Sequence, residues 1–181
     1  SSGKKAIGAG AGNPPVIVDE TADIKKAAKD IILGASLDNN LPCIAEKECF
    51  AISSIADELI ANMTKSGAYL VNKEQRDKIM EFCLVNKDGK YGINKKWVGK
   101  DAGLFLKEIG IDADPRLIIC ETDFNHPFVQ VEMMMPILPI VRVANIDEAI
   151  DFAVKAEHGN RHSAHIHSMN VERLTKFARE V

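Results

Sequence analysis

Short apolar runs alternate with amphipathic helical patterns along most of the chain, and this alternation constrains the fold more than any other feature. The run Pro15–Val18 predicts a short strand. Apolar residues then repeat at helical spacing from Ile24 to Ala35, which predicts an amphipathic helix that ends near Gly34. Because strands alternate with helices, we expect an α/β domain in three layers, with helices flanking a largely parallel sheet.

The same two patterns predict the remaining elements. Strands are expected at residues 47–52, 117–120 and 138–143, helices at 74–84, 101–109 and 146–157, and a polar turn at 86–89. A further helix has apolar residues at helical spacing from 55 to 63, with Ser53 or Ser54 as its N-cap and Gly67 after its end. Asn145 and Asn170 are predicted to cap the last two helices. No repeat or long linker interrupts these elements, so we expect one domain.

Length and charge exclude several classes of protein. The chain has 181 residues and a formal net charge of −3, and its 23 basic residues form no block of five or more like charges, which argues against a nucleic-acid partner. It lacks a run of about 18 apolar residues and the layout of a signal peptide, which argues against a membrane partner. We therefore expect a cytoplasmic protein.

The two ends of the sequence suggest a larger protein. The chain begins with small residues that no strand precedes, and it ends within a helical pattern at Val181. We expect residues 1–181 to be one domain of a longer chain.

The four cysteines are far apart and lack CxxC spacing, so we interpret them as reduced thiols. Cys49, Cys83 and Cys120 lie in apolar strand or helix patterns, which predicts that they pack in the core. Cys43 differs, because it follows Pro42 in a polar loop between a helix and a strand. It is a candidate nucleophile, and the alternative is an incidental loop thiol.

Two further segments have a functional and a structural interpretation. The glycines of residues 8–12 do not form a dinucleotide-binding loop, because Asn13 and two prolines follow them instead of a helix. They allow either a close approach to a ligand or strand, or a flexible turn. Glu132 precedes a long apolar stretch that contains Pro136 and Pro139. Its carboxylate is either a cap of local structure or an acceptor for ligand hydroxyl groups.

The histidines do not predict a metal site. His165 and His167 would share one face of a strand, a spacing that can hold a metal ion, but no further ligands stand at supporting spacing. We expect no metal, and the roles of His126, His162, His165 and His167 stay open.

Four segments together resemble one known family at its own order and spacing. They are GAGAGNPPVIVDETADI, SLDNNLPCIAEKE, NHPFVQVEMMMPILPIVRVANIDEAI and RHSAHIHSMNVERLTK. The chain from about residue 4 to 181 resembles the CoA-acylating branch of the aldehyde dehydrogenase superfamily, in particular bacterial acetaldehyde, propanal and butanal dehydrogenases. The resemblance covers the catalytic domain of that family. It implies that the Rossmann cofactor domain and the oligomerisation segment belong to other parts of a longer chain.

The resemblance also implies a role for each matching residue. Cys43 stands at the position of the catalytic nucleophile. Glu132 stands where the family has an acceptor for the nicotinamide ribose hydroxyls, and Gly10, Ala11 and Gly12 would line the nicotinamide side of the substrate tunnel. The implied reaction converts a short-chain aldehyde, CoA and NAD or NADP to acyl-CoA and the reduced cofactor through a thioacyl-cysteine. A homo-oligomer, and an association with a bacterial microcompartment shell, are implied for the full-length protein.

Two alternatives to this function remain. One is a hydrolytic aldehyde dehydrogenase that releases free acid. In such relatives a glutamate activates water, and the resemblance places it at Ala9, but no residue from 8 to 12 of this chain is acidic. The other alternative is a non-catalytic α/β binding module in which Cys43 has no chemical role.

Overall fold

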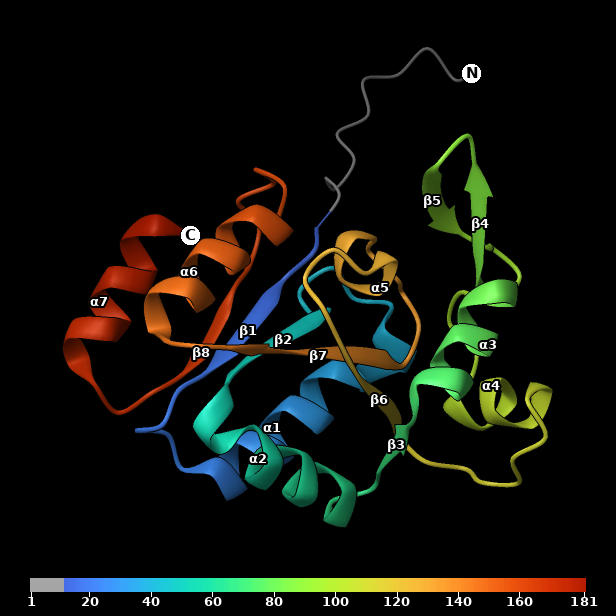
Figure 1. The fold of residues 1–181 in the computed structure, drawn as a ribbon, viewed down its shortest axis with the longest axis horizontal. Helices are drawn as coiled ribbons and strands as arrows, with labels where there is room; N and C mark the ends of the chain where they lie inside the picture. Colours follow the sequence, from blue (N-terminus) through green and yellow to red (C-terminus); the bar gives the residue numbers. More distant parts are fainter. Residues whose placement is uncertain (1–11) are drawn as a thin grey trace, which may run out of the picture.

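A six-stranded parallel sheet forms the centre of the computed structural model, which describes residues 12–181 (Figure 1). The strands lie in the order β3-β6-β7-β2-β1-β8, and every neighbouring pair is parallel. Their bounds are β1 (Pro15–Val18), β2 (Glu48–Ile52), β3 (Ala68–Val71), β6 (Leu117–Thr122), β7 (Ile137–Val143) and β8 (His165–His167). The predicted α/β class with a parallel sheet is confirmed.

Helices cover both faces of this sheet. One face packs against α1 (Ile24–Ala35) and α2 (Ser53–Lys65), and the other packs against α6 (Ile146–Ala156) at one end and α3 (Lys73–Cys83) with α4 (Ala102–Glu108) at the other (Figure 1). The helix α7 (Val171–Glu180) packs against α6. Strand residues alternate between the faces, as Val16 and Ile17 do. Within the described residues, no helix is long and apolar enough to cross a membrane.

The elements that were not predicted from the sequence include four short ones. A hairpin of β4 (Leu84–Lys87) and β5 (Lys90–Ile93) projects from the body around the predicted polar turn (Figure 1). Asp88 and Gly89 both have positive φ there, at 52° and 82°, as a tight hairpin turn requires. The other two are β3 and the one-turn helix α5 (Pro127–Gln130). Each has four residues, too few to display a clear helical or strand periodicity.

The predicted helix caps are confirmed at two helices and wrong at a third. The side chain of Asn145 accepts from two N–H groups at the start of α6, and Asn170 does the same at α7. At α2, however, neither serine is the cap. The strand β2 continues directly into α2, so Ile52 occupies the N-cap position, and the hydroxyl of Ser53 donates to the carbonyl oxygen of Val143 at 2.9 Å.

Candidate active site

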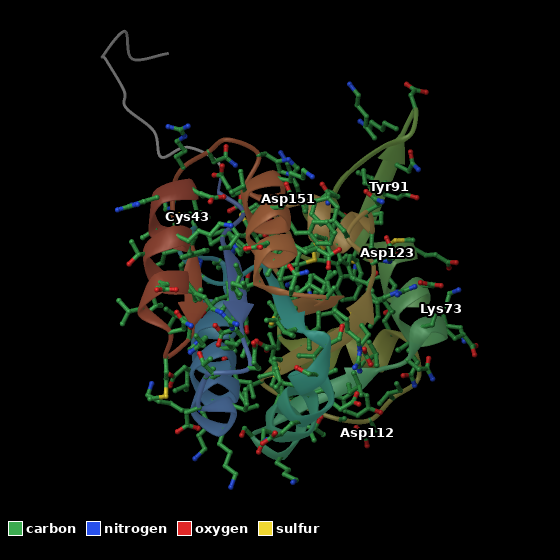
Figure 2. All side chains as sticks on the ribbon, turned by 60° about the vertical axis from the view of Figure 1, so that its left-hand side comes forward. Cys43, Lys73, Tyr91, Asp112, Asp123 and Asp151 are labelled. Atoms are coloured by element: carbon green, nitrogen blue, oxygen red, sulfur yellow. The ribbon has the colours of Figure 1, made fainter. Side chains whose placement is uncertain are left out.

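Cys43 is the only cysteine of the four that solvent can reach. It lies in the loop that leads into β2, near the top of the molecule in Figure 2. Cys49, Cys83 and Cys120 are buried, as predicted. Burial raises the pKa of Cys83 and of Cys120 to about 12, and it also raises the pKa of Cys49. These three groups are therefore neutral thiols near pH 7, and only Cys43 is placed for chemistry with a ligand.

The loop before Cys43 takes its shape from a polar sequence. Asp38, Asn39 and Asn40 form the core of a short turn, η1 (Leu37–Asn40), and all three have left-handed φ values, of 46°, 53° and 64°. Aspartate and asparagine tolerate this backbone region better than other non-glycine residues. The amide of Asn40 then donates to the carbonyl oxygens of Ala35 at 2.8 Å and Glu46 at 2.9 Å. These two bonds join the start of the loop to its end.

The loop of Cys43 meets segments that precede three other strands. A Cβ atom added to Gly12, just before β1, would lie 3.0 Å from the carbonyl oxygen of Cys43 and 3.6 Å from Cγ of His162, which precedes β8. The N–H of Gly12 donates to Oε2 of Glu132, which precedes β7, at 3.4 Å. Because these strands are parallel, their amino ends meet at one edge of the sheet. The structure thus brings Gly12, Cys43 and Glu132 together.

The other residues predicted to line the cofactor site, Gly10 and Ala11, lie outside the described residues, as does Ala9. At Gly12 the close contact with Cys43 leaves little room for any side chain, so the absence of a Cβ is what allows the two loops to approach. Of the two interpretations of the glycines, close approach therefore holds at Gly12.

The sequence analysis missed Lys47, a buried cation directly beneath the loop. Lys47 is only 1% exposed. Its ammonium group donates to the carbonyl oxygen and the side-chain Oδ1 of Asn40, at 2.7 Å and 2.6 Å, and to the carbonyl oxygen of Pro42 at 3.0 Å. The one signal in the sequence was its place between two glutamates at the start of an apolar strand, a position where a lysine is seldom buried without a partner.

The two glutamates beside Lys47 are also buried. Burial raises the pKa of Glu46, whose carboxylate lies against α1 in the space that a Cβ on Gly34 would occupy. Glu48 is fully buried, and neither of its carboxylate oxygens has a hydrogen-bond partner among the described residues. Burial holds the pKa of Glu48 well above its ordinary value, so this side chain is favoured in its neutral form.

The histidines take separate positions. His165 and His167 lie on β8, as predicted, and Nε2 of His165 is 3.0 Å from the carbonyl oxygen of Ile44, next to Cys43. His162 lies against Gly12, and its Nδ1 is 2.9 Å from Oγ of Ser163. His126 caps α5 through Nδ1. In the described part of the chain, no group of three His, Cys, Asp or Glu side chains is arranged to hold a metal ion.

Comparison with known proteins identifies the family. The model of the aldehyde dehydrogenase family matches residues 1–181. The chain is 45% identical to an acetylating acetaldehyde dehydrogenase of Salmonella typhimurium and 48% identical to a CoA-propanoylating propanal dehydrogenase of the same organism. Each match covers 98% of this chain, and they cover 39% and 38% of the relatives. The chain therefore spans about two-fifths of the length of these curated relatives.

Solved structures agree with this result. A propionaldehyde dehydrogenase of Rhodopseudomonas palustris, solved with bound CoA and an acylated cysteine, is 52% identical and superposes with a TM-score of 0.92 over 98% of this chain and 40% of that one. A propionaldehyde dehydrogenase from the fucose utilisation microcompartment of Clostridium phytofermentans is 55% identical, with a TM-score of 0.91 over 99% of this chain and 41% of that one. The chain described here belongs to the aldehyde dehydrogenase family.

Proposed function

We propose that residues 1–181 are the cysteine-bearing catalytic domain of a CoA-acylating aldehyde dehydrogenase. The full-length protein would convert a short-chain aldehyde, CoA and NAD or NADP to acyl-CoA and reduced cofactor. The observation that carries the proposal is the position of Cys43, the one accessible thiol, on a braced loop that contacts Gly12 beside Glu132. Support comes from the Rhodopseudomonas palustris relative, in which a cysteine is acylated and CoA is bound.

Cys43 would act as the nucleophile. Its thiolate adds to the carbonyl carbon of the aldehyde, and the oxygen of the adduct becomes an oxyanion. The backbone N–H of Cys43 is one donor that can hold this oxyanion, and among residues 12–181 no other group accepts from it. Loss of hydride from the adduct leaves a thioester on Cys43. CoA, as its thiolate, then attacks the carbonyl carbon of the thioester, which releases acyl-CoA and restores the thiolate of Cys43.

Gly12 and Glu132 fit a nicotinamide cofactor. Among the described residues, Glu132 accepts one long hydrogen bond, from the N–H of Gly12, so its carboxylate retains capacity to accept from the ribose hydroxyls. Gly12 has no side chain to fill the space beside the Cys43 loop. Bound NAD or NADP would supply the hydride acceptor, and Glu132 would orient its ribose while Cys43 holds the substrate. The adenine half of the cofactor would need the cofactor-binding domain of the longer chain.

The location of the protein is a further part of the proposal. The Clostridium phytofermentans relative comes from a bacterial microcompartment. By analogy, the full-length protein would be a cytoplasmic homo-oligomer packaged within such a compartment. Purification of intact compartments from the source cells, followed by detection of this protein within them, tests that placement.

The central experiment replaces Cys43 in the full-length protein. Cys43→Ser should abolish nearly all NADH or NADPH formation from propanal and CoA, because a serine hydroxyl without a dedicated base is a much weaker nucleophile than a thiolate. The matched control is Cys83→Ala, which removes a thiol buried in the core that α3 and α4 form with the sheet and should retain the activity of the folded protein. Full activity in Cys43→Ser, or loss of activity in folded Cys83→Ala alone, would contradict the assignment.

A further inference from the structure

The ammonium group of Lys47 holds the backbone on both sides of the turn before Cys43. Its bonds to the carbonyl oxygen and the side chain of Asn40 fix the last left-handed residue of η1. Its bond to the carbonyl oxygen of Pro42 fixes the residue that immediately precedes Cys43. The backbone N–H of Lys47 donates to the carbonyl oxygen of Pro14 at 2.8 Å, which ties Lys47 itself to the segment after Gly12. All three ammonium protons therefore have acceptors in the nucleophile loop.

The bond to Pro42 has a chemical consequence. The carbonyl of Pro42 and the N–H of Cys43 belong to one planar peptide unit, joined by resonance through the C–N bond. A cation that donates to the carbonyl oxygen draws electron density toward it and makes the N–H at the other end a stronger donor. That N–H is the group that would hold the oxyanion on a substrate bound to Cys43. Lys47 thus acts on the oxyanion through the peptide, without contact to substrate.

The charges around Lys47 support a cationic form near neutral pH. Burial lowers its pKa to about 8, and the groups that face it and oppose this shift are, in order, Glu132, Glu48, Cys43 and Glu46. Glu132 reaches it from the segment before β7, Glu48 from β2, and the other two from the loop itself. Because burial favours the neutral form of Glu48, the charge that chiefly keeps the buried ammonium group protonated is that of Glu132.

We propose that Lys47 is a positioning residue for the proposed reaction, whose ammonium group fixes and polarises the Pro42–Cys43 peptide so that the Cys43 N–H stabilises the oxyanion. The inference rests on the proposed function for its relevance to aldehydes. The polarised N–H itself is a property of the loop, and it is measurable without aldehyde, CoA or cofactor.

Two reagents that react with the sulfur of Cys43 distinguish an effect of Lys47 on the oxyanion from an effect on the reactivity of the thiol itself. Acylation of Cys43 by p-nitrophenyl acetate passes through a tetrahedral oxyanion, whereas alkylation by iodoacetamide does not. In full-length Lys47→Met, the rate of acylation should fall by about tenfold or more, because the Cys43 N–H becomes a weaker donor to the oxyanion. The rate of alkylation should change by less than about threefold. The control Lys78→Met, which removes an exposed lysine paired with Glu74 on α3, should leave both rates unchanged.

A pH series adds a readout that a structural role would not produce. In the unmodified protein, the ratio of acylation to alkylation should fall as the pH rises through about 8 and Lys47 loses its charge. In Lys47→Met the ratio should not change over this range. If Lys47→Met does not fold, Lys47→Gln, which keeps a donor but no charge, is measured in its place and should show the same lowered, flat ratio.

The outcomes distinguish this inference from the proposed function. The role of Lys47 is overturned if a folded variant keeps both rates unchanged or lowers both in equal proportion. It is also overturned if Cys43 of the wild-type protein is alkylated but not acylated. If the wild-type protein forms no reduced cofactor from aldehyde and CoA, yet the ratio depends on Lys47 as expected, the proposed function fails and the inference about Lys47 stands.

Discussion

Glu48 shows how a single buried side chain makes stability depend on pH. Its carboxyl group is fully buried without a hydrogen-bond partner among the described residues, and burial raises its pKa in the folded protein. In the unfolded chain it ionises near its ordinary value of 4.5. Above that pH the unfolded state gains a solvated charge that the folded state lacks, so the free energy of unfolding decreases as the pH rises.

We predict that Glu48→Gln removes this decrease, because glutamine has a similar shape and does not ionise. The stability of the variant relative to wild type should therefore improve between pH 5 and pH 8, as measured by urea unfolding at both values. Glu74→Gln is the control, since Glu74 is exposed and pairs with the exposed Lys78. A difference between Glu48→Gln and wild type that stays constant with pH would show that Glu48 is ionised in the folded protein.

At the scale of one element, the short helix α5 depends on an uncharged histidine. Nδ1 of His126 accepts from the N–H of Phe128 at 3.1 Å, which caps the helix, and a protonated Nδ1 cannot accept. Burial, and then the nearby charge of Arg76, lower the pKa of His126 to about 4. Its contribution to stability is therefore complete above the ordinary value of 6.5 and is lost as the pH falls from there through about 4.

We predict that His126→Asn weakens this acid sensitivity, because asparagine is a favoured N-cap and does not titrate. Between pH 7 and pH 4, wild type should lose on the order of 2 kcal/mol more stability than the variant. Urea unfolding at a series of pH values measures the difference. Equal losses in the two proteins would mean that His126 is protonated in the fold, or that α5 contributes nothing to global stability.

For the whole molecule, the site lies at an edge of the sheet that single α/β domains rarely use. In open α/β sheets, ligands usually bind beyond the carboxyl ends of the strands. Here the segments before β1, β2, β7 and β8 meet, at the amino ends of those strands. The proposed site therefore lies at the edge of the sheet opposite the usual crevice.

The proposed acyl acceptor leads to a prediction for the full-length protein. Since no residue from 8 to 12 is acidic, no carboxylate of that stretch can activate water to attack the thioester. With aldehyde and NAD or NADP but no CoA, we expect about one equivalent of reduced cofactor per Cys43, followed by slow turnover limited by hydrolysis. Addition of CoA should restore rapid turnover. Rapid multiple turnover to free acid without CoA would favour the hydrolytic alternative.

The sequence by itself determined the local features of this protein. Most helices and strands lie within a few residues of their predicted bounds, because hydrophobic periodicity and the caps at Asn145 and Asn170 act over a few neighbouring residues. The burial of three cysteines and the loop position of Cys43 follow from the same local patterns. Short elements such as β3 and α5 escaped prediction, since their few residues owe their conformation to the elements that they contact.

Only the tertiary structure decided which distant residues meet. Gly12 and Glu132 are 120 positions apart and become neighbours because their segments precede β1 and β7, on either side of β2. In the sequence, Lys47 is an ordinary residue at the start of a predicted strand. The structure shows that its ammonium group is bound by the turn that contains Asn40. Strand order and burial depend on the free energy of packing the whole sheet and its helices, which no short window of sequence contains.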